Sequence, residues 1–596
     1  MTSKDRDVFE MGPATLRISR KQLHTGTRRK LQEGMQKALP KEKLGVAVLK
    51  GGEPFLIYST DMEGTFRQES YFHYLFGVQE EDCLGAVNLQ TGRSYLFIPR
   101  LPDTYAVWMG PIKGLDDYKA IYAVDEVHYA DDMERVLSEL KPVALHLLCG
   151  TNTDRAVVSN PAFGFSLLLH MQRKTAEELE VMHYANQVAS AAHVQVMQQI
   201  KPHMMEYAAE SVFMYTAYSR GGCRHAPYTP ICASGPNGST LHYGHAASPN
   251  DREIGSNDKH AVVPLRARRI GSHSKHEMCL MQLERLAAIS GMSRVPIADR
   301  EIGSNDMLLL DMGCEYYCYD SDITCSFPAS GKFSEDQAMV YEAVLAAHQA
   351  VLQAIKPGIS WPDMHLLAER HILAGLKEGG WLQGEVEDML EQRIAALFMP
   401  HGLGHLLGLD THDVGGYAPG TPPRIDKPGL RSLRTARVLE EYMVVTVEPG
   451  CYFNPFLLHP AFEDPSQAPF LNKKRLEASL GFGGVRIEDD VVVTADGARS
   501  MTNVPRAITD IEAVMAGAPW PRQPATATQA AQPQHLTMAE QQLQSQHSGQ
   551  SDTTDVHNSK EMQKPAAASS SESSGMMAGV ASVVQSGIQS LGLGKK

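Results

Sequence analysis

Five side chains in the second half of the sequence have the types and settings that metal chemistry requires. Asp311 ends the apolar run MLLLD, and Asp322 follows within YYCYDSDITCSF. His405 lies among glycines in MPHGLGHLLGLD, where the backbone can approach a ligand closely. Glu448 ends VVTVE, and Glu488 lies within GGVRIEDDVVVT. An isolated carboxylate in a buried strand is expensive to desolvate, so both glutamates need a compensating partner.

Each of these residues has an ordinary structural reading when it is taken alone. An aspartate at a strand end is usually a turn or cap residue, and a loop histidine such as His401 or His412 usually has a structural role. As a set, however, four buried carboxylates would repel one another unless cations neutralise them. Two divalent cations are the economical solution, and oxygen-rich ligation favours Mn²⁺ or a similarly hard ion. Two such ions about 3.5 to 4 Å apart can share a hydroxide nucleophile and polarise a carbonyl.

Strands and helices between residues 171 and 516 must position these side chains. The clearest helix starts after Ser334, a good N-cap followed by acidic residues, and ends near Pro357. A longer helix is predicted in KTAEELEVMHYANQVASAAHVQVMQQIKP, where apolar residues recur every three to four positions before Pro202. These patterns predict a second, α+β domain that is entered through a long connecting helix.

The remaining sequence divides into an amino-terminal domain and a tail. Residues 10–170 alternate strand-like runs such as KLGVAVLKGG with polar helical stretches such as DDMERVLSELKP, which predicts an α/β domain. Residues 517–596 are rich in Gln, Ser, Ala, Thr and Pro. Such a segment buries too little apolar surface to offset its ordering entropy, so we expect a disordered tail.

The composition favours a cytoplasmic protein whose main partner is neither nucleic acid nor a membrane. Lys and Arg total 55 against 69 Asp and Glu, which gives a net charge of −14 that would repel polyanions. The amino terminus MTSKDRDVFEMGPATL has no apolar signal region, and no run of eighteen apolar residues occurs. Nine scattered cysteines fit reduced thiols better than a disulfide framework.

Several motifs, taken in order, resemble those of the prolidases (Xaa-Pro dipeptidases), a family of pita-bread-fold metallopeptidases. The motifs are LLDMGCEYYCYDSDITCSFP, MPHGLGHLLGLDTHDVGGY, RTARVLEEYMVVTVEPGCYF and GFGGVRIEDDVVVT. Similar stretches such as RQESYFHYLFGVQEEDCLGAV and YSRGGCRHAPYTPICASG extend the resemblance over about residues 10–515. The resemblance implies a creatinase-like amino-terminal domain, a pita-bread catalytic domain and a homodimer.

The resemblance also implies a metal-binding role for each of the five residues. Asp311, Asp322, His405, Glu448 and Glu488 would hold two Mn²⁺ ions, with Co or Zn as alternatives. Asp322 and Glu488 would bridge both ions. Glu448 would in addition carry the proton of the attacking hydroxide to the leaving imino nitrogen.

Further residues resemble those that bind the substrate in this family. His245 in LHYGHA and His412 in DTHDVGG would hold the substrate and stabilise the tetrahedral intermediate. Arg434 of RTAR would grip the substrate's carboxylate, a role that suits the planar guanidinium fork. Tyr228 and Arg486 are additional substrate-binding candidates. For Arg486 the alternative of a simple ion pair with a neighbouring ligand carboxylate stays open.

The function expected from this resemblance is hydrolysis of Xaa-Pro dipeptides with release of free proline, through attack by a metal-bridging hydroxide. Two alternatives remain at this level. One is an aminopeptidase P, which acts on longer peptides with proline in second position. The other is a pita-bread protein that has lost its metals and serves as a binding module, against which the intact set of five residues argues.

One feature departs from the family: the sequence DREIGSND occurs at residues 251–258 and again at 299–306. Removing residues 259–306 restores the family spacing between YGHA and DMG. The removed stretch is basic up to residue 298, with seven Lys or Arg against two Glu. It is either translated intron-derived or duplicated sequence, or a genuine loop that binds through arginines such as Arg266. We favour the first explanation, because either copy of the repeat could form the turn; a native tryptic peptide from within 270–294 would refute it.

Overall fold

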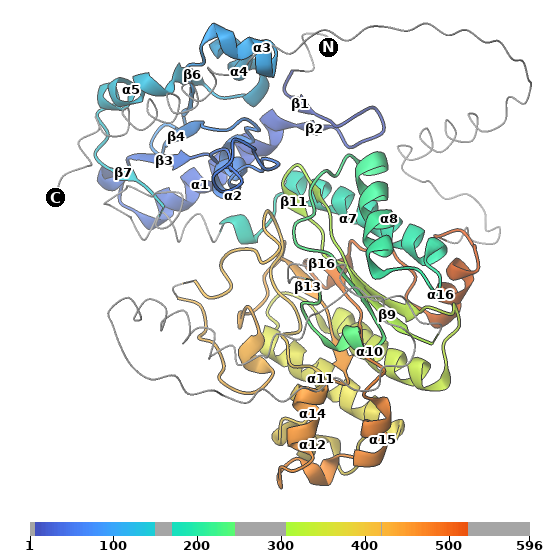
Figure 1. Cartoon of the computed structure of the whole chain (residues 1–596). Coiled ribbons are helices and arrows are strands. Elements are labelled where there is room, and N and C mark those ends of the chain that lie inside the picture. Colours follow the sequence, from blue (N-terminus) through green and yellow to red (C-terminus); the bar gives the residue numbers. More distant parts are fainter. Residues whose placement is uncertain (1–5, 149–169, 245–304, 419, 522–596) are drawn as a thin grey trace, which may run out of the picture.

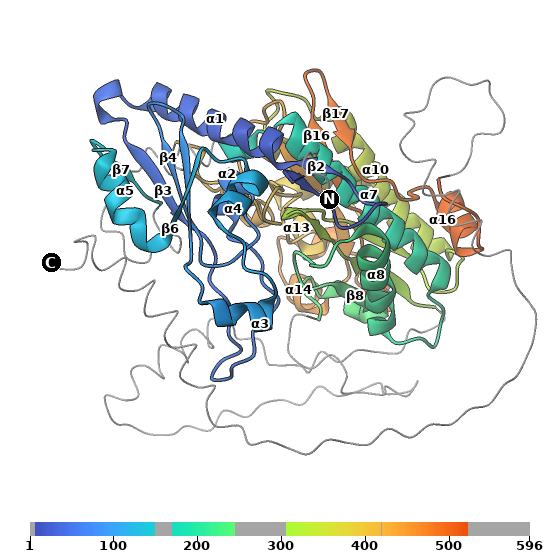
Figure 2. The same cartoon turned by 90° about the horizontal axis from the view of Figure 1, so that it is seen from above.

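The computed structural model describes residues 6–148, 170–244, 305–418 and 420–521. Within these ranges an amino-terminal α/β domain, coloured blue, lies beside a larger catalytic domain that mixes helices with several small sheets (Figures 1 and 2). The architecture is the one predicted from the sequence. No helix in this part of the chain combines the length and apolarity needed to cross a bilayer.

The amino-terminal domain is built on a mixed five-stranded sheet of order β6-β5-β4-β3-β7. Strands β3, β4 and β5 are antiparallel neighbours, whereas β6 and β7 pair in parallel with β5 and β3. The strands are β3 (Val46–Lys50), β4 (Leu84–Asn88), β5 (Ser94–Ile98), β6 (Glu126–Tyr129) and β7 (Leu145–His146), and β1 (Val8–Phe9) pairs separately with β2 (Ile18–Ser19). The helices are α1 (Arg20–Ala38), α2 (Ser70–Phe76), α3 (Ala106–Met109), α4 (Leu115–Tyr122) and α5 (Met133–Glu139).

Alternation along β3 shows why both faces of this sheet are covered. Val46 and Val48 pack in one apolar cluster with Val136 of α5. Ala47 and Leu49, on the opposite face, join the main core that continues into the catalytic domain. Because successive side chains of a strand point to opposite faces, an all-apolar strand needs cover on both sides.

The predicted connecting helix is confirmed as α7 (Ala176–Gln199). Thr175 caps its amino terminus: the Glu178 N–H donates to Thr175 Oγ1 at 3.2 Å, and the Thr175 N–H donates to Glu178 Oε2 at 2.8 Å. This reciprocal pair satisfies donors that a helix start leaves unpaired. The helix ends before Pro202, as predicted.

The catalytic domain places its described strands in four small sheets, one of which is the antiparallel pair of β10 and β11. Strand β9 lies between β8 and β12, β16 lies between β13 and β17, and β14 pairs with β15, all antiparallel. The strands are β8 (Ile231–Ser234), β9 (Met307–Asp311), β10 (Glu315–Tyr316), β11 (Tyr319–Asp320), β12 (Thr324–Pro328), β13 (Val444–Val447), β14 (Gly450–Tyr452), β15 (Gly484–Arg486), β16 (Asp489–Val493) and β17 (Ala498–Ser500).

Helices surround these sheets, and α10 and α11 pack on each other below β9 in Figure 1. The predicted cap of α10 is confirmed, because the Gln337 N–H donates to Ser334 Oγ at 3.3 Å. The helices are α7, α8 (Glu206–Gly221), α10 (Glu335–Ala354), α11 (Trp361–Glu378), α12 (Val386–Glu391), α13 (Ala395–Phe398), α14 (Pro455–Ala461), α15 (Lys473–Ser479) and α16 (Ile508–Met515).

The predicted insertion connects two paired strands. Strands β8 and β9 pair from Ile231↔Asp311 to Ser234↔Leu308, and the repeat lies in the sequence between them. Residues 259–304 of the insertion and the candidate residue His245 lie outside the described residues. The pairing of β8 with β9 is therefore present in a chain that contains the extra residues, consistent with the slow growth of loop-closure entropy with length.

Removal of residues 522–596 is expected to leave the fold and its stability unchanged. Near the end of the described residues, the Trp520 Nε1–H donates to the Asn503 carbonyl at 3.1 Å. A chain ending at Pro521 keeps this contact, so its melting temperature should match that of the full chain. A fall of more than about 4 °C in a thermal scan, which corresponds to roughly 1–2 kcal/mol for a domain of this size, would contradict the expectation. The predicted disordered tail itself lies almost wholly outside the described residues.

Candidate metal centre

Strand register brings the five predicted residues to one place in the catalytic domain, where β9, β13 and β16 lie close together in Figure 1. Asp311 ends β9 opposite Thr324, so Asp322 lies just beyond the same pair. Val447 of β13 pairs with Asp489 of β16, and Gly450 of β14 pairs with Arg486 of β15. Glu448 and Glu488 therefore both lie in the gap between the β13–β16 pair and the β14–β15 pair.

The histidine of the set is fixed to the strand that precedes Glu448. The His405 N–H donates to Thr446 Oγ1 at 3.1 Å, and the Thr446 N–H donates to the His405 carbonyl at 2.9 Å. This approach requires glycine at 404, because a Cβ there would lie 2.0 Å from the Thr446 carbonyl oxygen. His405 Nδ1 lies 3.0 Å from the Leu406 carbonyl, which leaves Nε2 facing the carboxylates.

The donor atoms fit a divalent-cation site. Asp322, His405 and Glu488 each offer a ligand atom, and these atoms lie within 4.8 Å of one another. His405 Nε2 is 3.4 Å from Asp322 Oδ2 and 3.6 Å from Glu448 Oε1. Asp311 Oδ1 is buried and has no hydrogen-bond partner among the residues described. A buried carboxylate oxygen without a partner beside further carboxylates indicates a place for positive charge.

The electrostatics of the cluster support the same conclusion. Burial raises the pKa of Asp311 to about 6 and that of Glu448 to about 7, and it raises the pKa of Glu488 well above its usual value. For Asp322 burial acts in the same direction, but hydrogen bonds from His405 and from Tyr228 hold its pKa below the usual value. The ionised carboxylates are short of positive charge, which bound cations would supply.

Neighbouring hydroxyl and carboxyl groups hold the candidate ligands, and most of them were missed in the sequence. Thr324 Oγ1 donates to Glu488 Oε2 at 2.6 Å, and the Asp322 N–H donates to Asp490 Oδ2 at 2.8 Å. Tyr228, a predicted substrate-binding residue, donates its hydroxyl to Asp322 Oδ1 at 2.6 Å. Thr324 could have been found, because it lies two residues after Asp322 and strand residues two apart share a face.

Arg486 lies against the candidate ligands with all three guanidinium nitrogens occupied. Its Nη2 is 2.6 Å from Asp311 Oδ2, its Nη1 donates to the Tyr452 hydroxyl at 2.7 Å and its Nε donates to Thr324 Oγ1 at 3.0 Å. The ion pair that the sequence left open as an alternative is therefore present. In this arrangement Arg486 orients Asp311, and each of its three nitrogens already has a partner in the protein.

His401 joins the same network, although no role was predicted for it. Its Nε2 lies 2.9 Å from the Tyr452 hydroxyl and its Nδ1 lies 3.8 Å from Glu448 Oε2. Burial, and next the charge of Arg486, lower the pKa of His401 to about 3, so the imidazole is neutral at neutral pH. Arg486, Tyr452 and His401 thus link Asp311 to Glu448 through a continuous chain of contacts.

Arg434 and His412 lie at the open side of the cluster. The Arg434 side chain is exposed and makes no hydrogen bond or ion pair with any residue that the structure describes. The charges of Glu448 and Asp322 nevertheless act on its pKa, which places it close to the candidate ligands. The His412 ring centroid is 4.6 Å from that of His405. Partial burial, with the charges of His405 and Arg434, lowers the pKa of His412 to about 3.

Two family models match the chain. Residues 180–263 and 273–495 match the model described as Metallopeptidase family M24, which is more than half of the chain, and residues 24–146 match the model Aminopeptidase P, N-terminal domain. The chain belongs to metallopeptidase family M24. The only residues that the M24 match omits between its two parts, 264–272, lie inside the predicted insertion.

Curated relatives of this M24 metallopeptidase include dipeptidases and aminopeptidases. The chain is 46% identical to the Xaa-Pro dipeptidase of Mus musculus, over 87% of this chain and 98% of the relative. It is also 46% identical to the Xaa-Pro dipeptidase of Homo sapiens, over 85% of this chain and 96% of the relative. A probable Xaa-Pro aminopeptidase of Sordaria macrospora is 33% identical, over 79% and 91%.

Solved structures with the same two-domain fold include aminopeptidases. The M24 chain aligns with the aminopeptidase PepP of Pseudomonas aeruginosa at a TM-score of 0.60 and 28% identity, over 83% of this chain and 98% of that one. It aligns with Zn-substituted Escherichia coli aminopeptidase P in complex with product at a TM-score of 0.59 and 26% identity, over 82% and 98%. The predicted family, the fold class and the identification as a hydrolytic metallopeptidase are confirmed.

Proposed function

We propose that this M24 metallopeptidase hydrolyses Xaa-Pro dipeptides and releases free proline. The observation that carries the proposal is the guanidinium of Arg434, which lies beside the carboxylate cluster and has no partner among the residues that the structure describes. A free arginine fork suits the carboxylate of a carboxy-terminal proline and would limit substrates to dipeptides. The 46% identity with Xaa-Pro dipeptidases along nearly their whole length supports the same choice.

Two Mn²⁺ ions are the proposed cofactors, with Co and Zn as alternatives. When bound, such ions lower the pKa of a water molecule and polarise the scissile carbonyl. Their proposed ligands are Asp311, Asp322, His405, Glu448 and Glu488. Glu448 is also proposed to carry the proton of the attacking hydroxide to the leaving nitrogen, and its Oε2 lies 3.8 Å from His401 Nδ1.

The residues at the open side would hold the dipeptide. Arg434 pairs with the substrate's carboxylate, and the neutral His412 imidazole offers an N–H to the carbonyl oxygen on which charge develops. His245 is proposed for the same task on its resemblance alone. Tyr228 and Arg486 are proposed to act by holding Asp322 and Asp311 rather than by touching the substrate.

The deciding experiment compares Gly-Pro with Gly-Pro-Gly after the protein has been incubated with Mn²⁺ and freed of excess metal. Proline release from Gly-Pro should exceed cleavage of Gly-Pro-Gly by at least about 100-fold in kcat/KM, because only the dipeptide places its carboxylate beside Arg434. Preference for Gly-Pro-Gly would indicate an aminopeptidase P. Fewer than one bound ion per chain, with no cleavage of either peptide, would indicate a binding module.

A chain lacking residues 259–306 is the matched comparison in this assay. Proline release only from the shortened chain would mark the repeat as a sequence error or an inactivating segment. Equal activity of both chains would mark it as a tolerated loop. If neither folded, metal-loaded chain released proline, the proposed function would be wrong.

A cytoplasmic location is also proposed. None of the seven cysteines in the described part of the chain forms a disulfide, and six of them are buried. Reduced thiols are typical of proteins from the cytosol, where disulfides rarely persist.

We further propose a homodimer, supported by an exposed apolar patch on the amino-terminal domain. The patch comprises residues 55–62 and 107–112, where Tyr58 is 95% exposed and Trp108 is 83% exposed. The pKa of Tyr105 indicates that the two segments are neighbours. Burial raises this pKa most, and the charges of Glu81 and Glu63 raise it further. Glu63 directly follows the first segment, and Tyr105 lies two residues before the second. Large exposed aromatic side chains grouped in this way are typical of interfaces.

Replacing Trp108 with glutamate is expected to weaken this dimer. A central tryptophan of an interface commonly contributes 2 kcal/mol or more, so the dimer dissociation constant should rise by roughly 30-fold or more. Sedimentation velocity over a range of concentrations measures the shift. Phe456→Glu is the matched control, because Phe456 is 77% exposed but lies on α14 of the catalytic domain. A monomer formed by the unaltered protein would contradict the proposal.

A further inference from the structure

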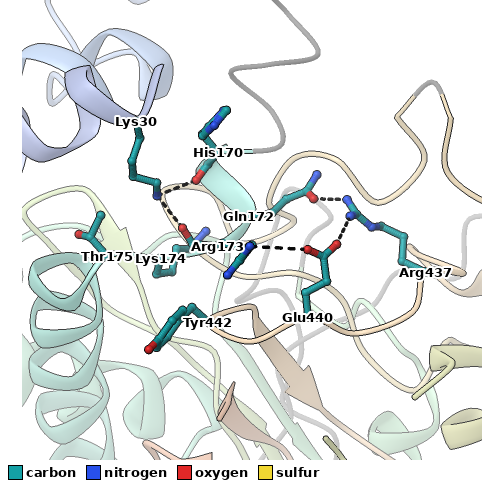
Figure 3. Close-up of a pocket in the computed structure, with 9 residues that line it drawn as sticks. All are labelled: Lys30, His170, Gln172, Arg173, Lys174, Thr175, Arg437, Glu440 and Tyr442. Carbon is teal, nitrogen blue, oxygen red and sulfur yellow. Dashed lines mark hydrogen bonds and ion pairs between the residues drawn. The ribbon is translucent and has the colours of Figure 1, made fainter. Parts of the chain in front are cut away.

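The segment between the two domains, residues 170–175, lies beside Arg437, Glu440 and Tyr442 of the catalytic domain (Figure 3). The Lys174 N–H donates to the Tyr442 carbonyl at 2.9 Å, and Arg173 forms an antiparallel bridge with Met443. Met443 directly precedes β13, whose end carries Glu448. The linker therefore pairs alongside the residues that lead into β13, the strand that precedes one of the proposed ligands.

Lys174 makes a buried ion pair with the residue after His412. Its Nζ is 2.6 Å from Asp413 Oδ2, and the two side chains are 2% and 0% exposed. The same Nζ donates to the Met171 carbonyl at 2.5 Å. Because both groups are shielded from water, the ion pair fixes the backbone at Asp413. It thereby also fixes the backbone position from which the adjacent His412 side chain projects.

Gln172 makes the corresponding contact with the segment that carries Arg434. Arg437 Nη1 donates to Gln172 Oε1, and Arg437 Nη2 donates to Glu440 Oε1 at 2.8 Å. The Gln172 amide also packs against Gly415, which has a φ of +91° and where a Cβ would lie 1.4 Å from Gln172 Nε2. Gln172 therefore touches both the loop after His412 and the loop after Arg434.

The two loops are themselves joined beside these contacts. Thr435 Oγ1 donates to the Gly416 carbonyl at 3.2 Å, and the Arg437 N–H donates to Thr435 Oγ1 at 3.2 Å. A Cβ at Gly416 would lie 2.1 Å from the Arg434 carbonyl oxygen, so the backbones are in close contact. A shift at Gln172 or Lys174 is thus passed to both proposed recognition residues.

The amino-terminal domain holds the linker through two side chains, Lys30 of α1 and Tyr74 of α2, whose hydroxyl donates to the His170 carbonyl at 3.3 Å. Lys30 of α1 donates its Nζ to the carbonyls of His170 at 2.8 Å and Arg173 at 2.6 Å (Figure 3). A pocket of about 390 Å³ lies among these residues. Its basic side chains already have partners, namely backbone carbonyls, Glu440 and Asp413, so we assign no ligand to it.

We infer that Gln172 and Lys174 are positioning residues for substrate recognition. Lys174 sets the place of His412 through Asp413, and Gln172 sets the place of Arg434 through Arg437. The inference rests on the proposed function for the identity of the substrate. By this inference the linker, which is held by α1 and α2, takes part in recognition of the dipeptide.

The first test compares two substitutions of similar size at Gln172. Gln172→Leu removes the acceptor for Arg437, and KM for Gly-Pro should rise roughly tenfold while kcat changes less than about twofold. Gln172→Glu keeps an acceptor and should restore KM to within about twofold of the unaltered value. Gln198→Leu is the control, since Gln198 is a partly buried glutamine that donates to the Ala518 carbonyl, outside both loops. Mn²⁺ content should be the same in all four proteins.

The second test removes the buried ion pair. Lys174→Met alone would leave the Asp413 charge buried without a partner and prevent folding, so it is combined with Asp413→Asn. The double variant should fold, raise KM for Gly-Pro and speed amide hydrogen exchange in residues 411–416 and 434–437. Lys332→Met, which removes an exposed ion pair with Glu512, should leave exchange in both segments unchanged.

Measurements of amide hydrogen exchange and of KM can distinguish failure of this inference from failure of the proposed function. Unchanged exchange in both segments, in folded Gln172→Leu and in the folded double variant, would overturn the inference. An unaltered KM in both variants of an active enzyme would overturn it as well. If the unaltered protein failed to cleave Gly-Pro, the proposed function would be wrong, and faster exchange in the two segments would still support the positioning role.

Discussion

Replacing Asp322 with asparagine is expected to abolish both cation binding and peptide hydrolysis. Asp322 accepts a hydrogen bond from Tyr228 on one oxygen and lies 3.4 Å from His405 Nε2 through the other. An amide would present an N–H₂ group to one of these neighbours and remove the charge that two divalent ions require. Turnover of Gly-Pro should fall by at least about 10³-fold, or roughly 4 kcal/mol of transition-state stabilisation. Bound Mn²⁺, measured by elemental analysis, should fall from two ions per chain to one or none.

Thermal unfolding distinguishes this loss from misfolding. Without metal, Asp322→Asn should melt close to the unaltered protein, because relief of the repulsion among the four carboxylates offsets the loss of the charged contacts that Asp322 makes with Tyr228 and His405. With Mn²⁺ present, only the unaltered protein should gain stability, since a ligand that binds the folded state alone stabilises it. Asp496→Asn, at an exposed aspartate, is the control. A variant that kept two ions and its turnover would remove Asp322 from the proposed ligands.

Replacing Arg434 with alanine should act on substrate binding instead of on the metals. Loss of a bidentate charged contact commonly costs 2–3 kcal/mol, so KM for Gly-Pro should rise by about 100-fold with bound Mn²⁺ unchanged. Arg434→Lys should recover only part of this loss, because an ammonium group cannot form the planar double contact. The melting temperature should not change, as the guanidinium has no partner in the part of the chain that the structure describes.

The prolinamide form of the dipeptide gives the sharper control for Arg434. Gly-Pro-NH₂ lacks the carboxylate, so the unaltered protein should cleave it poorly, and Arg434→Ala should make little further difference. Arg486→Met is the opposite case: it would leave Asp311 buried without its ion pair and should lower the melting temperature. If Arg434→Ala weakened the two substrates equally, Arg434 would not be the carboxylate clamp.

Local patterns were predictable from the sequence because their causes are local. The Ser334 cap, the connecting helix and the β3 strand depend on residues within a few positions of one another, and all are present. The candidate ligands could be selected only as a set, because each has an ordinary structural explanation when it is taken alone. Their meeting in one place follows from the strand register, and their roles as ligands remain predictions.

Contacts between distant strands were not predictable in the same way. The engagement of Arg486 with Tyr452 and Thr324 depends on how β15 lies against β14 and β12, and a shift of one residue would turn each side chain to the other face. The face of α7 shows a similar limit. Met182 and Ala185 are fully buried as the periodicity predicts, but His193 on the same helix is equally buried, with Nε2 3.0 Å from the Met312 carbonyl. Apolar periodicity in the sequence predicts which face of a helix is buried, but it does not predict which atoms of the rest of the protein contact that face.

The linker's strand-like pairing bears on how genes of this family could be recombined. A chimera that joined a foreign amino-terminal domain to this catalytic domain should place its crossover before His170, so that Gln172 and Lys174 stay with the loops that they contact. A crossover after Thr175 would import a foreign linker and mismatch it with Asp413 and Arg437. These contacts therefore define the part of the chain that has to be kept together with the catalytic domain in a chimera. This part begins at His170, six residues before the first residue of α7.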